Sequence, residues 1–326
     1  MKCKIHTFRE KAKIDNINGE DIDELFERAN EYLQIAESDP KAYENAAVVL
    51  EKCVQLQHPE ATCILGDLYF YGYGVDRNYK KAKKLYERAI EFGVDEGYQN
   101  LGIIYSKGLS TEIDHSKALF CFKKGAELGN VASIFNLGLE YLNSSLYNNS
   151  NDLAKECFEK ASKLGSSEAY FILGMMHYDK EFNNVNITTA LKYFIKGVEL
   201  GNADAMYMLS TMYKKGLGVK KSPSISLKYL TRAADLGSIQ AVYELGVLYY
   251  SGDGVEKDYE KAKKLLMKAA KKEYPEAFYK LGLLFSENKT CKADVVKAVK
   301  FLKKACTLGI QKACVALREI KAELRN

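Results

Sequence analysis

Helix-breaking residues are scarce in this sequence. Four prolines occur among 326 residues, and tryptophan is absent altogether. Proline interrupts an α-helix more strongly than any other residue, whereas Ala, Lys, Leu and Glu, all frequent here, favour helices. We therefore expect a mainly helical protein.

Long apolar segments are also missing. No run of 18 apolar residues exists, so no transmembrane helix and no membrane partner are expected. The first residues, MKCKIHTFREKAKIDNINGE, are basic but lack the apolar region of a secretory signal. These observations predict a cytoplasmic protein.

Motifs of catalysis and metal binding are lacking as well. The sequence contains no HExxH, no CxxC and no Walker loop. The four histidines, at positions 6, 58, 115 and 177, share no metal-ligand spacing, and we interpret His177 as a packed structural residue. No cofactor and no metal ion are expected.

What the sequence does contain is a repeat of 36 residues. Leucine is followed by glycine at Gly66, Gly102, Gly138, Gly174, Gly246 and Gly282, with Ser210 in the one remaining place. A second column consists of Ala82, Ala118, Ala154, Ala190, Ser226, Ala262 and Ala298. A third consists of Gly93, Gly129, Gly165, Gly201, Gly237 and Gly309, with Glu273 as the exception.

Each repeat is interpreted as two amphipathic helices. In residues 276–311 the apolar residues follow the i, i+3, i+4, i+7 spacing twice, on either side of a turn. Gly72 and Gly74 can adopt positive φ in the first such turn. Gly66 lies inside a helix, so we infer that its position requires the absence of a side chain where helices approach closely. One hairpin cannot bury both helices, but stacked copies can.

The residues of these units resemble a known family. ATCILGDLYFYGYGVDRNYKKAKKLYERAIEFG and AVYELGVLYYSGDGVEKDYEKAKKLLMKAA are similar to the Sel-one-like repeat (SLR), a relative of the tetratricopeptide repeat. The resemblance covers seven units, residues 60–311, and implies an all-α, right-handed α/α superhelical solenoid. The family's frequent tryptophan is replaced by Tyr86, Phe122, Phe158 and Phe194, and the Gly-x-Gly turn is lost in units three, four and seven.

The segments outside these units divide into three parts. Residues 1–20 are expected to be an N-terminal tail, and residues 21–59 a divergent helical hairpin. Residues 312–326 are expected to be a capping helix, since solenoid ends need a polar outer face.

A candidate binding face follows from the helical step of 100° per residue. Opposite the expected core stripe of the first helices lies an aromatic column: Phe135, Phe171, Tyr207, Tyr243 and Tyr279. Beside it lies an acidic row: Glu96, Glu168, Asp204 and Glu276. In tetratricopeptide-like solenoids this face lines the concave groove. Alternatively, neighbouring first helices shield the rings as part of the core.

The expected function is that of a non-enzymatic scaffold or adaptor that binds a peptide segment or partner protein in this groove. The resemblance implies such a role, and no small-molecule cofactor is needed for it. Residues 255–326 carry 18 Lys and Arg against 9 Asp and Glu. Nucleic acid is nevertheless not a favoured partner, because arginine is scarce and no known binding module is present.

The cysteine-rich branch of the family implies two alternatives. Cys306 and Cys314 have the spacing of that branch's helix-stapling disulfides, but only the last unit shows it. They form either a disulfide or, as we favour for a cytoplasmic protein, two reduced core thiols. The same branch has been linked to penicillin binding and weak β-lactamase activity. The one Ser-x-x-Lys match, Ser286 to Lys289, has no KTG partner, so an enzyme is not favoured.

Overall fold

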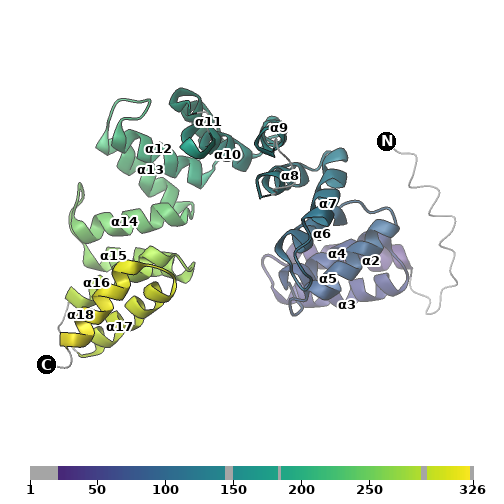
Figure 1. Cartoon of the computed structure of the whole chain (residues 1–326). Helices are drawn as coiled ribbons and strands as arrows, with labels where there is room; N and C mark the ends of the chain where they lie inside the picture. The colour runs from purple at the N-terminus through teal and green to yellow at the C-terminus, as the bar shows by residue number, and fades with distance from the viewer. Residues whose placement is uncertain (1–20, 144–149, 183–184, 288–291, 324–326) are drawn as a thin grey trace. The chain divides into compact units, whose positions relative to one another are not determined.

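The computed structural model describes residues 21–143, 150–182, 185–287 and 292–323. Within these ranges the chain is all-α, with paired helices and no strand (Figure 1). It divides into two compact units, Met1–Leu164 and Gly165–Asn326.

The helices of the first unit follow one another in antiparallel pairs. Their bounds are α2 Ile22–Ile35, α3 Lys41–Gln55, α4 Pro59–Tyr71, α5 Tyr79–Glu91, α6 Gly97–Lys107, α7 His115–Glu127, α8 Val131–Asn143 and α9 Ser150–Lys163.

The second unit continues the same pattern. Its helices are α10 Ser167–Tyr178, α11 Ile187–Glu199, α12 Ala203–Lys215, α13 Pro223–Asp235, α14 Ile239–Ser251, α15 Tyr259–Lys271, α16 Pro275–Glu287, α17 Lys292–Thr307 and α18 Gln311–Glu323, with a 3₁₀ turn at Lys180–Phe182.

Each even-numbered helix from α2 to α16 packs most extensively on the odd-numbered helix that follows it, which confirms the predicted hairpins. Within each unit the first helices of successive repeats also touch, as α6 with α8 and α12 with α14 do. Successive second helices make no comparable contact in the described parts of the chain. The first helices therefore form the more closely packed row of each unit.

The predicted glycine turns end the helices as expected. Gly72 ends α4 in the left-handed conformation, with φ of 78°. The side chain of Asn78 then accepts a hydrogen bond from the Lys81 amide and starts α5. After the second helices, the exception in the glycine column adopts the same backbone: Glu273 has a φ of 59°. The turn geometry thus persists where the glycine is missing.

The glycines inside the first helices make room for one large side chain. A Cβ atom at Gly102 would lie 2.5 Å from the Phe122 ring, and one at Gly174 equally close to the Phe194 ring. These rings are among the most deeply buried side chains of the described residues. The close approach inferred from sequence is therefore made by a large side chain of the paired second helix, which is an aromatic ring in most repeats and a leucine at Gly246 and Gly282.

Candidate functional site

The aromatic column occupies one position of the repeat. Each of its members is the fifth residue of a first helix, because the 36-residue period keeps the helical register constant. Phe135 lies on α8 in the first unit. Phe171, Tyr207, Tyr243 and Tyr279 lie on α10, α12, α14 and α16 of the second unit.

The rings are half-buried rather than fully open. Phe171 packs beside Phe194 of the paired second helix, with ring centroids 6.2 Å apart. Tyr243 packs on Tyr274, with centroids 5.0 Å apart. Tyr207 and Tyr279 contact the hydrophobic core of the second unit. These rings therefore contact the core and retain some accessible surface.

A polar contact holds the Tyr207 hydroxyl in place. Tyr207 donates a hydrogen bond of 2.9 Å to Glu244 on the next first helix. The other Glu244 oxygen lies 3.7 Å from Lys214 Nζ. Burial, with Tyr274 and Glu276 nearby, raises the pKa of Tyr243 to about 12. Burial and the nearby Glu244 also raise the pKa of Tyr207, so both hydroxyls stay protonated near neutral pH and can donate.

The acidic row is not uniform. Glu96 and Glu168 are exposed, whereas Asp204 and Glu276 are half-buried. Asp204 accepts a hydrogen bond of 2.7 Å from Ser238 Oγ, so one of its carboxylate oxygens already has a partner within the protein.

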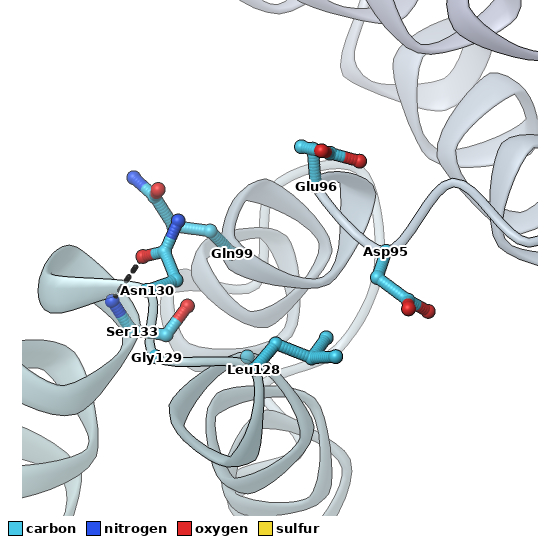
Figure 2. Close-up of a pocket in the computed structure, with 8 residues that line it drawn as sticks. Asp95, Glu96, Gln99, Leu128, Gly129, Asn130 and Ser133 are labelled. Carbon is cyan, nitrogen blue, oxygen red and sulfur yellow. Dashed lines mark hydrogen bonds between the residues drawn. The ribbon is translucent and has the colours of Figure 1, made fainter. Parts of the chain in front are cut away.

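The first unit also contains a polar pocket that sequence reasoning missed. It has a volume of about 230 Å³ and lies where α6 meets the turn between α7 and α8. Figure 2 shows its lining, which includes Asp95, Glu96, Gln99, Leu128, Asn130 and Ser133. Two features of the sequence could have revealed it. Gln99 occupies the position of the aromatic column one repeat before Phe135, and Ser133 stands where most other repeats have alanine.

The family follows from the repeat units themselves. Seven consecutive stretches match the Sel1 repeat: residues 59–92, 95–130, 131–166, 167–202, 203–238, 239–274 and 275–310. The chain belongs to the Sel1 repeat family.

Solved structures share this fold. A Sel1 repeat protein from Oxalobacter formigenes is 26% identical, with a TM-score of 0.66 over 97% of this chain and 90% of that chain. A protective antigen of uropathogenic Escherichia coli with an SLR fold is 22% identical, with a TM-score of 0.60 over 98% of this chain and 68% of that chain. Comparison with curated proteins gave no match.

The last Sel1 repeat is linked to the following helix by a disulfide. Cys306 on α17 is bonded to Cys314 on α18, with Cα atoms 4.9 Å apart. The preference for two reduced thiols is therefore corrected: the interhelical turn brings the two side chains together. Since disulfides are rare in reducing compartments, this bond argues against the cytoplasmic expectation. Cys53, Cys63, Cys121 and Cys157 are free.

Ser286, the serine of the Ser-x-x-Lys match, lies on α16. Its hydroxyl donates to the Leu283 carbonyl at 2.8 Å, a bond within its own helix. Lys289, its partner in the Ser-x-x-Lys match, lies outside the described residues. Among the residues that the structure describes, no three His, Cys, Asp or Glu side chains are grouped to hold a metal ion.

His177 is packed in the protein interior, as predicted. His177 is 9% exposed and its ring stacks on that of Tyr193, as a packed side chain does.

No helix in the described part of the chain combines the length and apolar character needed to cross a bilayer.

Proposed function

We propose that this Sel1 repeat protein is a non-enzymatic scaffold that holds an extended peptide segment of a partner protein along its first helices. The observation that carries the proposal is the recurrence of a half-buried ring at one position of α10, α12, α14 and α16. A ring whose inner side is packed loses little conformational entropy when its outer side is covered. Such pre-ordered aromatics are favourable anchors for a partner.

The charges beside the rings define the chemistry of the peptide. Glu168 is exposed, and Glu276 lies close enough to raise the pKa of Tyr243. A peptide with Lys or Arg between its apolar residues would complement both carboxylates. Phe135 and Glu96 provide the same chemistry in the first unit.

Peptides selected from a phage-displayed library on the whole protein would test this proposal. We expect them to contain basic and apolar residues, and Tyr243→Ala to weaken their binding at least about tenfold, as loss of 1.4 kcal/mol does. Since Tyr243 contacts Tyr274, the urea midpoint of the variant must be measured as well. Peptides that bind the folded Tyr243→Ala variant normally would contradict the proposed site.

A matched control is Tyr259→Ala. Tyr259 lies on the second helix α15, is 38% exposed, and is outside the aromatic column. We expect its loss to leave peptide affinity unchanged. Glu168→Gln should slow association and reduce its dependence on salt, because an exposed charge acts mainly by long-range attraction.

A further inference from the structure

The polar pocket of the first unit lies where glutamine, rather than an aromatic ring, occupies the position of the aromatic column. Gln99 occupies the position that Tyr243 occupies four repeats later, and Asn130 occupies the position of Tyr274. In the later repeat the two rings pack together with centroids 5.0 Å apart and fill the space. The smaller Gln99 and Asn130 leave it open, as Figure 2 shows.

The pocket carries negative charge, and none of its lining residues is a cation. Asp95 and Glu96 are the only charged residues that line it. Glu96 is exposed and makes no hydrogen bond or ion pair with another described residue. Lys124, a neighbouring cation, is paired with Glu127 at 2.8 Å, and Asp95 has only a lesser electrostatic effect on it. In the second unit, by contrast, Asp204 at the Glu96 position is satisfied by Ser238.

An unsatisfied hydroxyl lies at the base of the same pocket. Ser133 is fully buried, and its Oγ has no hydrogen-bond partner among the described residues. Its backbone amide is already bonded to Asn130 Oδ1 at 2.7 Å, and Figure 2 shows its hydroxyl on the side of Gln99. A buried hydroxyl without a partner is unfavourable, so a ligand that supplies one is favoured by this site.

We propose that this pocket binds the guanidinium group of an arginine side chain. Its lining includes four hydrogen-bond acceptors: the carboxylates of Asp95 and Glu96, the Gln99 amide oxygen and the Ser133 hydroxyl. A guanidinium has five donors and no acceptor, and therefore matches such a set better than the single ammonium of lysine. The exposed side chain of Leu128 lies at the rim, where it can cover the apolar stem of the arginine.

This inference deepens the proposed function. It rests on that function in one respect only, namely that the arginine belongs to a partner peptide. A free probe separates the two ideas. Nα-acetyl-L-arginine methylamide contains the guanidinium but is too short to span the aromatic column. We therefore expect it to bind the whole protein even if no peptide follows the rings of the second unit.

Probe binding is followed by the amide NMR shifts of residues 95–99 and 128–133. We expect saturable, millimolar binding, and Gln99→Phe to weaken it at least about tenfold, because a ring at this position fills the pocket. Glu96→Gln should weaken binding by about tenfold as well, through loss of a charge-assisted contact. Glu199→Gln removes an exposed carboxylate on the second helix α11, outside the aromatic column and the acidic row; it is the control and should change nothing.

Three results would overturn the assignment. The first is absence of these shift changes at saturating probe concentrations. The second is equal binding of Nα-acetyl-L-lysine methylamide, which would mean that any cation suffices. The third is probe binding that survives both Glu96→Gln and a folded Gln99→Phe variant. If Gln99→Phe fails to fold, the Asp95→Asn, Glu96→Gln double variant tests the pocket instead, and unchanged binding there overturns the proposal.

Discussion

Ser210 and Ser226 interrupt two different small-residue columns, and the structure brings them into contact. Ser210 Oγ donates to the Ser226 carbonyl at 2.9 Å and lies 3.1 Å from the Ser226 hydroxyl. Both side chains are buried between α12 and α13. In the other repeats the same two positions hold glycine and alanine, so this repeat has exchanged an apolar contact for a polar one.

The two serines are expected to be energetically coupled. Ser210→Ala should destabilise the fold by about 1–3 kcal/mol, because it leaves the Ser226 hydroxyl buried without its partner. Ser226→Ala should cost less, since its carbonyl still accepts from Ser210. The double variant should be more stable than the sum of the single losses implies, as urea unfolding of all three variants will measure. Strictly additive losses would contradict the coupling.

Glu273 is expected to destabilise the turn that it forms. Its φ of 59° is one that a side chain disfavours, and glycine holds this position in the other six repeats. Glu273→Gly should raise stability by up to about 1 kcal/mol, even though it removes an exposed ion pair with Lys304. Gly237→Ala is the converse control. A Cβ there would meet no atom within 4 Å, so any loss of stability measured by urea unfolding comes from the strain of the positive φ alone.

His58 is expected to make stability depend on pH. Its Nδ1 accepts a hydrogen bond from the Ala61 amide at 3.2 Å, and its ring packs on Phe26. Burial lowers its pKa, despite the opposing effects of Glu60 and Asp23. Below its usual pKa of about 6.5, the unfolded chain therefore binds more protons than the folded protein, and stability falls as pH decreases.

The variant His58→Asn isolates this effect, because asparagine also caps a helix. Between about pH 7 and pH 5, the urea midpoint of the wild type should fall further than that of the variant. Equal shifts for the two proteins would show that His58 does not titrate differently in the folded state.

The Cys306–Cys314 bond is expected to be measurable by thiol counting. Protein denatured without reductant should show two thiols fewer than reduced protein, and digestion should yield a crosslinked peptide spanning both cysteines. Closing a loop of this length stabilises a fold by about 2–3 kcal/mol in the chain-entropy model, so reduction should lower the urea midpoint. Finding the same number of thiols with and without reductant would restore the cytoplasmic expectation.

Much of the architecture was predictable from the chain alone. A period of 36 residues with small residues at constant places determines which helices pair, because each hairpin must bury its apolar stripe on the next. The positive φ of the glycine column followed from residue type in the same way. Such features are local, or repeat identically, so one-dimensional spacing is enough to predict them.

Only the tertiary structure determined which side chains meet. The sequence alone identified the aromatic column, the acidic row and the substitutions at Ser210 and Ser226. It did not show that Tyr243 packs on Tyr274, that Ser210 bonds to Ser226, or that the Ser133 hydroxyl is buried without a partner. Those outcomes depend on how far each side chain reaches across two or three helices. A helical wheel gives the direction of a side chain from its own helix but not the distance to its neighbours, and that distance decides whether a ring is covered or a pocket remains open.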